Sequence, residues 1–419
     1  MSFVPFASGV SVLSALVAFL LLVPEDSVWR FHKSSEPIKS LSNSLFSKTF
    51  SSFMDNPFLS LTPFSSSLIV SSTRGTNHVG LYATKPIGPN ELVLSISPDL
   101  TGLVIDGIHN IPLELSQLIG FSKLSDDVKT VLIIAFHKTN DLENSSPLGY
   151  LWKGVGVEPI PDHRWIKYKG IFTLTNGTIS GIDEIDDAVS AASSVVADAV
   201  AFSRSHNLPR TFGISETEIK WSYVFLHAFG VLASDKSQRK ILVAPLVFAR
   251  HSINQARTLK LSPSPIGTLD IYTQQSLERG DELLVNGKPY LSDAYSFLFL
   301  GSWVSDTSIH RGKIRLVFEN DFSIHHWFSN VEEESSEFRL SLIHQLLKKQ
   351  TSPSDPWAEL YAIDKILVAL HEKLNAIRPK SVSDTPIERL RFIYFTGILS
   401  EIIYFESLLN EKRAEIFHV

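Results

Sequence analysis

The chain contains no cysteine, and this absence excludes disulfides, thiolate zinc sites and cysteine nucleophiles together. An excess of basic charge is also missing, because the formal net charge is −6 at pH 7. This balance gives no electrostatic support for a nucleic-acid partner. Four short motifs are absent as well: the P-loop, the dinucleotide-binding fingerprint, the G-x-S-x-G elbow and the H-E-x-x-H metal motif.

The size and composition are those of a folded protein. The sequence has 419 residues, of which 44% are hydrophobic and 20% are charged. A chain of this length can form two or three domains around a substantial core. The pair His325-His326 suggests a metal site, but no third ligand lies at a useful spacing. We therefore predict no metal and interpret the pair as part of a strand or loop.

Charged side chains are missing from the first 24 residues. Within them, residues 10–23 read VSVLSALVAFLLLV. This run is about as long as the apolar region of a signal peptide, and the uncharged stretch is just long enough to span a bilayer. A buried core helix would have the same composition, but the Ser-rich sequence that follows disfavours it. We predict that residues 1–24 are a signal peptide or a membrane anchor, with entry into the secretory pathway or contact with a membrane.

Residues 25–66 are rich in serine and phenylalanine, with scattered lysine and few acids. Such a segment cannot bury much apolar surface, which is typical of a linker. It also resembles a transit peptide, and a signal followed by a transit segment would direct the protein to a plastid or another organelle. Both interpretations remain open.

Strands are predicted in two groups. Residues 65–74 favour a strand, and residues 80–100 contain an apolar stretch, a turn at 86–90 and a second strand that begins at Glu91. Residues 240–285 favour strands again over KILVAPLVFA, LDIYTQ and DELLV, with a turn at Arg279-Gly280-Asp281. Strands therefore precede and follow a long middle section.

Helices are predicted in that middle section. Residues 126–138 and 183–204 have helical character, and the first is apolar enough to be deeply buried. The sequence Ser215-Glu216-Thr217-Glu218 is a capping box, in which serine and glutamate each accept a bond from an orphan backbone N–H. It opens a third, amphipathic helix.

The C-terminal part is also predicted to be helical. Residues 338–349 and 357–377 form helices, and a second capping box at 385–388 opens another. After it, these residues keep helical spacing: Leu390, Ile393, Ile398, Ile402, Phe405 and Leu409.

Four local motifs carry a resemblance. They are Val79-Gly80-Leu81-Tyr82-Ala83-Thr84 with Glu91-Leu92-Val93-Leu94; Trp221; Arg250-His251-Ser252; and Gly280-Asp281-Glu282-Leu283-Leu284-Val285 followed by Ser292-Asp293 and Gly301. Their order and spacing resemble those of SET-domain proteins of the Rubisco large-subunit lysine methyltransferase-like class. The resemblance implies an α+β fold. A SET-like β-fold over 67–304, with a helical insertion at about 101–214, would precede an all-α substrate-binding-like domain over 332–419.

The resemblance also implies a chemistry. Members of the class are S-adenosylmethionine-dependent protein-lysine N-methyltransferases, in which the lysine and the cofactor enter a narrow channel from opposite sides. The lysine must be neutral to attack, although its free pKa is about 10.4. A dry channel of carbonyl oxygens, closed by a tyrosine, orients the amine. Carried over by position, the cofactor-binding residues are His78, Val79, Gly80, Leu81, Arg250 and His251.

This sequence departs from the class pattern at polar positions. His78 replaces the first glycine of the opening motif, and Arg250 replaces the asparagine that contacts the cofactor. Phe229 stands near the position of the arginine on the Trp221 helix. Gly287 replaces the tyrosine that closes the channel, and Leu300 replaces the aromatic of the last motif. Tyr290, three residues beyond Gly287, is the candidate catalytic tyrosine. Two functions follow: a protein-binding scaffold with lost or weakened methyl transfer, or an active, diverged protein-lysine N-methyltransferase. Either would take a protein or peptide as substrate or ligand.

The leader gives the first testable prediction. A fusion of residues 1–66 to a fluorescent reporter should localise to membranes or to an organelle, because the apolar run at 10–23 is too hydrophobic to remain solvated. Fluorescence microscopy measures this directly, with the reporter alone as the control. A diffuse cytosolic signal from the fusion would contradict the assignment.

Overall fold

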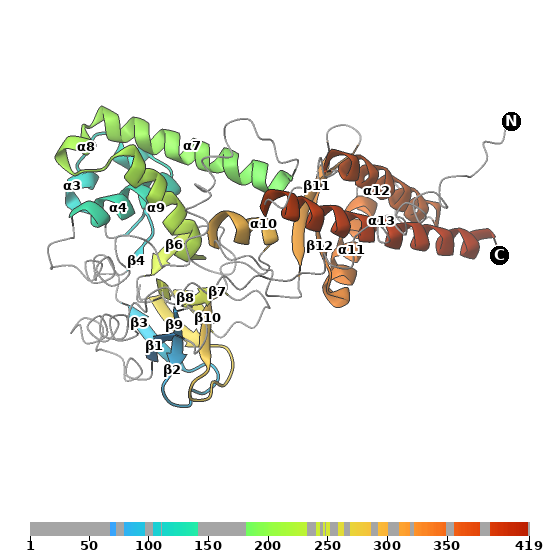
Figure 1. Cartoon of the computed structure of the whole chain (residues 1–419), viewed down its shortest axis with the longest axis horizontal. Coiled ribbons are helices and arrows are strands. Elements are labelled where there is room, and N and C mark those ends of the chain that lie inside the picture. Colours follow the sequence, from blue (N-terminus) through green and yellow to red (C-terminus); the bar gives the residue numbers. More distant parts are fainter. Residues whose placement is uncertain are drawn as a thin grey trace, which may run out of the picture. The chain divides into compact units, whose positions relative to one another are not determined.

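The computed structural model describes most of the chain beyond the leader (Figure 1). The described residues are 68–72, 79–96, 104–109, 111–140, 182–232, 240–243, 246–247, 249–251, 259–263, 269–285, 292–300, 310–318, 322–348, 356–377 and 386–417. All belong to one compact unit, Asn43–Val419. The predicted leader (1–24) and linker or transit segment (25–66) lie outside the described residues. Strands and helices fall into separate runs along the chain, as expected for an α+β protein.

Strands from both predicted groups share the same sheets. One sheet has the order β1 (Leu68–Ser72), β2 (Val79–Ala83), β10 (Glu282–Val285) and β7 (Arg250–His251). A second contains β3 (Leu92–Ile96), β9 (Leu269–Thr273) and β8 (Leu259–Pro263), and a third β4 (Val104–Ile105), β6 (Lys240–Val243) and β5 (Val231–Leu232). The strand predicted over 240–249 is shorter than expected, since β6 ends two residues before Pro245, which cannot donate to a strand ladder.

Two turns of similar sequence pair with each other across this region. Residues 84–91 and 274–281, hereafter the paired turns, are bridged at Ile87 and Leu277, whose backbones exchange two hydrogen bonds of 2.9 Å. Ala83 N–H donates to Asp281 O at 2.9 Å, and the equivalent bond in the other half, from Thr273 N–H to Glu91 O, is 3.0 Å. The paired turns are therefore related by approximate twofold symmetry.

Left-handed residues occupy equivalent places in the two turns. Asn90 has φ 57° and Gly280 has φ 95°, a region that asparagine tolerates and glycine adopts without strain. The Asn90 N–H then donates to Thr273 O and the Gly280 N–H to Ala83 O, at 2.9 and 2.8 Å. Both predicted turns, at 86–90 and 279–281, are confirmed.

The helical insertion lies between β4 and β5. It comprises α3 (Leu113–Ser116), η3 (Phe121–Lys123), α4 (Asp126–Asn140), α7 (Asp183–Ser205), α8 (Leu208–Thr211) and α9 (Glu216–Phe229). The apolar helix predicted at 126–138 is buried along nearly its whole length and packs against α7, α9 and β4.

The capping box at the start of α9 is only half formed. Ser215 caps the helix as predicted, its hydroxyl accepting from the Glu218 N–H at 3.3 Å. The predicted reciprocal bond from the Ser215 N–H to the Glu218 carboxylate is wrong, because the Ser215 N–H donates to Gly213 O at 2.9 Å. The Glu218 carboxylate instead accepts a hydrogen bond from Lys138 Nζ of α4 at 2.6 Å, and this contact replaces the predicted bond to the Ser215 N–H.

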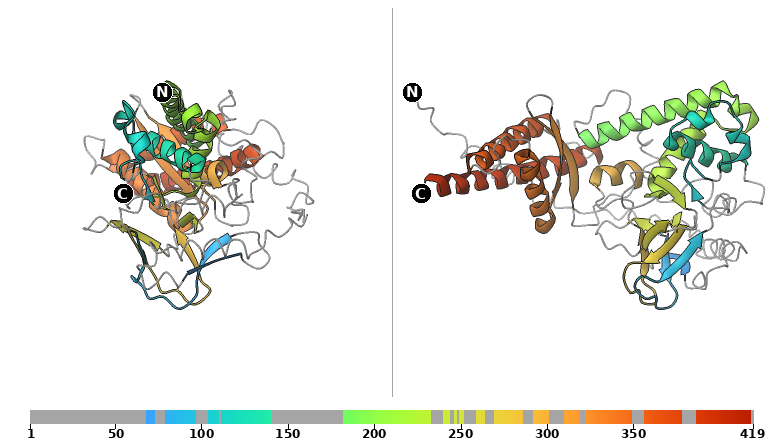
Figure 2. Two further views of the ribbon diagram at one scale, coloured as in Figure 1. Left: turned by 90° about the vertical axis from the view of Figure 1, so that its left-hand side faces the viewer. Right: turned by 180° about the vertical axis from the view of Figure 1, so that it is seen from behind.

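A β-hairpin absent from the predicted boundaries precedes the C-terminal helices. β11 (Arg311–Val317) and β12 (Ser323–Ser329) pair antiparallel, in the interval that the predicted ranges 67–304 and 332–419 leave unassigned. The hairpin contacts α11 (Glu332–Leu347), α12 (Pro356–Ile377) and α13 (Pro386–Phe417), as the orange-to-red part of Figure 2 shows. These helices are therefore not a bundle by themselves, because they share their core with a two-stranded sheet.

The apolar seam predicted on α13 is correct at five of its six positions. Leu390, Ile398, Ile402, Phe405 and Leu409 are buried. The exception is Ile393, which is only partly buried because its neighbour Tyr394 takes the inward place and is fully buried.

One buried carboxylate organises the C-terminal helices. Glu401 of α13 is 1% exposed and lies 2.9 Å from both His326 Nε2 of β12 and Arg339 of α11. Arg339 also lies over the Tyr404 ring, 4.1 Å from its centroid. Among the described residues one helix, Ile387–Ile416, is long and apolar enough to cross a membrane, with 33% of its most apolar window buried. Glu401 lies on that helix.

The ring of Phe328 fills the space between β11 and α13. A Cβ built on either Gly312 or Gly397 would overlap this ring. The ring also meets Tyr394 edge to face, with centroids 5.2 Å apart. Both glycines are therefore required by close approach.

Replacing Gly397 with alanine tests this packing. Alanine gains about 1 kcal/mol of helix propensity over glycine, but overpacking a filled core costs about 1–3 kcal/mol. We expect Gly397→Ala to lower the free energy of unfolding by up to about 2 kcal/mol, measured by denaturant titration, and a second change, Phe328→Leu, to recover part of it. Ser400→Ala on the exposed face of α13 is the matched control. A Gly397→Ala protein that is more stable than the wild type by the full helix-propensity gain of about 1 kcal/mol would refute the close contact.

Candidate functional site

Two predicted cofactor-binding segments lie on either side of one strand. β2, which carries Val79, Gly80 and Leu81, pairs antiparallel with β10, with Leu81 opposite Leu283. β7, which consists of Arg250 and His251, pairs parallel with the same strand, with Arg250 opposite Leu284. Residues that are about 170 apart in sequence thus lie in one sheet with a single strand between them, and Leu81 is buried.

Other predicted site residues lie outside the described residues. His78 immediately precedes β2, and Ser252 immediately follows β7. Gly287 and the candidate catalytic Tyr290 belong to the connection between β10 and α10 (Asp293–Tyr295). Their assignments remain predictions.

The helix α9 presents an aromatic face where the resemblance places a cation. Trp221 stacks on Phe225 with ring centroids 4.6 Å apart, and Phe225 meets Phe229 at 4.8 Å. Trp221 and Phe229 are partly buried and pack against the main core. Lys138 Nζ lies 4.0 Å from the Trp221 ring centroid. Trp221 is therefore a packed aromatic anchor.

A buried lysine and tyrosine meet at the C-terminal end of α9. Lys240 Nζ donates to the His227 carbonyl oxygen at 2.9 Å and contacts the Tyr295 hydroxyl. The Tyr295 hydroxyl donates to the same carbonyl at 2.5 Å. Lys240 is 6% exposed and Tyr295 is 7% exposed. Phe299, on the π-helical turn η7 (Ser296–Leu300), packs against both Tyr295 and His227.

This lysine–tyrosine cluster was not predicted from the sequence. Carbonyls in the last turn of a helix have no partner within the helix, and they form the negative end of its dipole. An ammonium group is therefore stabilised at the His227 carbonyl even in a buried place. The available signal was a single basic residue, Lys240, at the start of the apolar run KILV.

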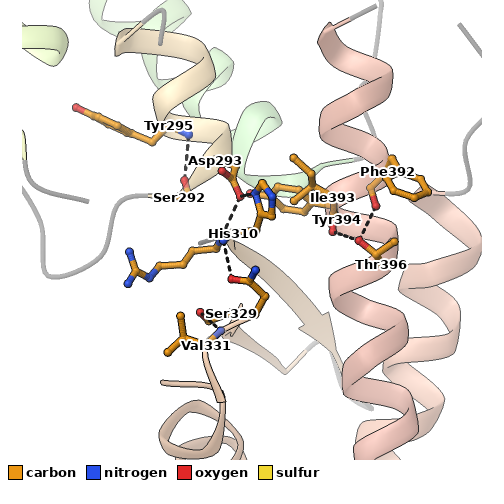
Figure 3. Close-up of polar contacts among 12 residues, drawn as sticks. Ser292, Asp293, Tyr295, His310, Ser329, Val331, Phe392, Ile393, Tyr394 and Thr396 are labelled. Carbon is orange, nitrogen blue, oxygen red and sulfur yellow. Dashed lines mark hydrogen bonds and ion pairs between the residues drawn. The ribbon is translucent and has the colours of Figure 1, made fainter. Parts of the chain in front are cut away.

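The Ser292-Asp293 motif connects α10 to two other elements, α7 and β11, and Figure 3 shows Ser292, Asp293 and Tyr295 at this junction. The Ser292 hydroxyl donates to Glu184 of α7 at 2.6 Å and accepts from the Tyr295 N–H at 3.0 Å. Asp293 accepts from the Arg311 N–H of β11 at 2.9 Å. The motif therefore holds α10 in place through buried polar contacts.

Glu184 also binds the C-terminal helix. Its second carboxylate oxygen accepts from the Tyr394 hydroxyl at 2.7 Å. Burial, followed by the charge and hydrogen bond of Glu184, raises the pKa of Tyr394 well above its ordinary value, so the phenol stays protonated and donating.

A histidine lies beside Asp293 on the other side. His310 Nδ1 is 3.5 Å from an Asp293 carboxylate oxygen, and the His310 N–H donates to the Asn330 side chain at 2.7 Å. The contact with Asp293 raises the pKa of His310 above its ordinary value, although partial burial opposes the shift. His310 is thus a titrating group at the junction between α10 and the hairpin.

The two adjacent histidines of β12 do not share a ligand. His326 is buried against Glu401, as described above, while burial and nearby cations lower the pKa of His325. Residues 325 and 326 point to opposite faces of the strand. Across the described ranges, no group of three His, Asp or Glu side chains could hold a metal ion.

The His310–Asp293 contact should make stability depend on pH. Since the folded-state pKa of His310 is raised, the contact stabilises the fold fully below about pH 6.5, the unfolded value, and loses its effect as pH rises through the folded value. We expect His310→Gln to lower the free energy of unfolding by up to about 1 kcal/mol at pH 5.5, because solvent at the partly exposed His310 side chain screens its attraction to the buried Asp293. The difference should vanish near pH 8.5.

Denaturant titrations across pH measure this effect. Leu340→Gln, on the exposed face of α11, changes no titratable group and is the matched control, so its difference from the wild type should not vary with pH. A His310→Gln effect that is equal at both ends of the pH range would contradict the ion pair.

Comparison with known proteins gives structural matches. No protein-family model matches the chain, and neither does any curated protein. The crystal structure of the SET domain of LSMT bound to lysine and AdoHcy matches 88% of this chain and 93% of its own, with a TM-score of 0.55 and 13% identity. The structure of Rubisco LSMT bound to sinefungin and monomethyllysine matches over the same shares, with a TM-score of 0.53 and 12% identity. At these identities the likeness establishes architecture, and it confirms that the chain has the SET-domain fold of the Rubisco LSMT structures.

Proposed function

We propose that this protein binds a protein or peptide ligand through a SET fold, and that its S-adenosylmethionine-dependent lysine methylation is lost or weakened. The fold supports the first half of the proposal. Solved structures of similar architecture are bound to lysine with AdoHcy, or to monomethyllysine with sinefungin. The side chains of this chain support the second half.

The aromatic face of α9 is the observation that carries the proposal. The family resemblance places a cation at Phe229, and here that side chain meets Phe225 at 4.8 Å within an aromatic ladder. A phenyl ring can neither carry charge nor donate hydrogen bonds. A polar cofactor group that relied on this position would be buried without its partner, which costs about 1–3 kcal/mol.

Lysines on the neighbouring elements are engaged in other contacts. Lys138 of α4 pairs with Glu218 at 2.6 Å and lies over Trp221. Lys240 of β6 binds the His227 carbonyl and Tyr295. Recruiting either ammonium group to replace the missing cation would break these contacts.

A second function, methyl transfer by a diverged enzyme, is supported by the sheet itself. β2 and β7 both flank β10, so the backbone framework assigned to the cofactor is present. An active enzyme would hold S-adenosylmethionine by main-chain groups of these strands and use Tyr290 to close the channel. With either function, residues 1–24 would place the protein at a membrane or within an organelle.

Titration calorimetry with S-adenosylmethionine tests the proposal. Loss of two polar partners at about 1–3 kcal/mol each weakens affinity by one to several orders of magnitude. We therefore expect the folded wild-type protein to bind weakly or not at all. Restoring the family residues with His78→Gly and Arg250→Asn together should recover measurable affinity.

Two further measurements complete the test. Arg210→Asn on the exposed face of α8 is the matched control and should leave binding unchanged. Micromolar binding by the wild type would overturn the scaffold proposal, and Tyr290→Phe would then be assayed for loss of methyl transfer to protein lysine.

A further inference from the structure

The β11–β12 hairpin has one covered face and one exposed face. Side chains alternate along a strand, and Ile314, Leu316 and Phe328 point inward, where α11, α12 and α13 bury them. On the outer face Val317 is 51% exposed and the Arg315 side chain is 46% exposed. The outer face therefore belongs to the surface of the described part of the chain.

Two elements border this outer face without covering it. The Arg311 N–H donates to Asp293 of α10 at 2.9 Å, and the Arg315 N–H donates to Asp183 of α7 at 2.8 Å. Backbone N–H groups lie in the plane of a sheet, so α7 and α10 meet β11 at its edge. The edge of β11 is thus occupied by side chains at these positions, whereas the face beside it is open.

The strand register brings three basic side chains together on the outer face. Arg315 is opposite His325, and Lys313 is opposite Trp327. Opposed residues of an antiparallel pair have Cβ atoms about 4.5–5.5 Å apart. Lys313 and Arg315 are close enough for their charges to act on His325. The hairpin face is hereafter the set Lys313, Arg315, Val317, Ser323, His325 and Trp327.

Acidic side chains neutralise little of this charge. The hairpin face has no acidic member, and Lys313 forms no ion pair with any described residue. Asp187 lies 4.0 Å from Arg315, but both side chains are about half exposed and such a pair contributes little. The Asp183 carboxylate binds Lys373 of α12. The hairpin face is therefore a basic surface on a chain whose formal net charge is −6.

We propose that the hairpin face binds an acidic segment of a partner protein in an extended conformation. Lys313 and Arg315 are two residues apart on one strand, so they lie about 6.5–7 Å apart. Alternate side chains of an extended peptide have the same spacing, so acidic residues at every second position meet both cations. Val317 adds an exposed apolar contact at the end of this row.

The number and context of the cations favour a protein partner over other polyanions. Recognition of an anionic membrane surface takes clusters of roughly four to eight lysines and arginines, and the hairpin face has two, with one histidine. The net charge of −6 repels nucleic acid from the molecule as a whole. The inference goes beyond the proposed function and does not depend on it, because the hairpin face contains no candidate cofactor-binding or catalytic residue.

Fluorescence anisotropy with the full-length protein at low ionic strength tests the proposal. The probe is a fluorescein-labelled peptide of alternating glutamate and serine, and the same peptide with glutamine in place of glutamate is the reference. We expect saturable binding of the glutamate probe only, which the double variant Lys313→Gln/Arg315→Gln weakens at least about fivefold. The conservative variant Lys313→Arg keeps the charge and should retain wild-type affinity.

A matched variant and a second ligand serve as controls. Lys260→Gln/Arg210→Gln removes two exposed cations elsewhere, on β8 and α8, and should leave the affinity unchanged. Equal weakening by this control variant, or absence of binding by the wild type, would overturn the proposal. Binding of phosphatidylserine vesicles that is lost in Lys313→Gln/Arg315→Gln would assign the face to a membrane and would also overturn it.

The pH dependence of binding gives a readout that a purely structural role of the hairpin would not move. Burial and the charges of Lys313 and Arg315 lower the pKa of His325, although Asp187 and Asp183 oppose the shift. A carboxylate bound beside His325 favours the charged imidazole, so binding takes up a proton and strengthens as pH falls. We expect the wild type to bind the glutamate probe about two- to threefold more tightly at about pH 6 than at about pH 8, and His325→Gln to remove most of that difference. An equal pH dependence in His325→Gln would contradict a ligand seated over this face.

Discussion

The carboxylate of Glu184 joins three segments that are distant in sequence. It accepts hydrogen bonds from Ser292, the residue before α10, and from Tyr394 of α13, while Glu184 itself lies in the first turn of α7. Neighbouring Asp183 adds a contact to Lys373 and accepts from the Arg315 N–H at 2.8 Å. A buried tyrosine hydroxyl without an acceptor would cost about 1–3 kcal/mol. The first turn of α7 thus fixes the helical insertion, the element that follows the candidate loop, and the C-terminal helices to one another.

Local patterns in the sequence predicted the elements that local forces determine. The helix over 126–138 followed from its apolar run, and the turn at Gly280 from the residue itself. The hairpin β11–β12 was not assigned from the sequence, apart from the interpretation of His325-His326 as part of a strand or loop, although its alternation of buried and charged positions is typical of a strand. Its inner face is covered by helices that come later in the chain. On α13, the spacing fitted Ile393 as well as Tyr394. What selects Tyr394 is Glu184, 210 residues away, and no local pattern contains that contact.

In the candidate site, too, features with a local sequence pattern were predicted and features formed by long-range contacts were not. Gly80 and Leu81 were assigned to the cofactor through the family resemblance, and the structure places them on β2 beside β10. The cluster of Lys240, Tyr295 and the His227 carbonyl was not recognised, since it brings together β6, α10 and the end of α9. It satisfies the C-terminal end of a helix with a buried cation. A lysine engaged in this way stabilises the junction of β6, α9 and α10.

The paired turns have a consequence for the order of folding. The two bridged residues of the paired turns, Ile87 and Leu277, are separated by about 190 residues in the sequence. Closing an unstructured loop of that length costs entropy before any contact forms, and long-range pairing slows folding. The helices of the insertion rely on local contacts and can form first, which shortens the effective loop. The twofold pairing of the turns would then be a late event, and the strands on both sides would gain their register together when it closes.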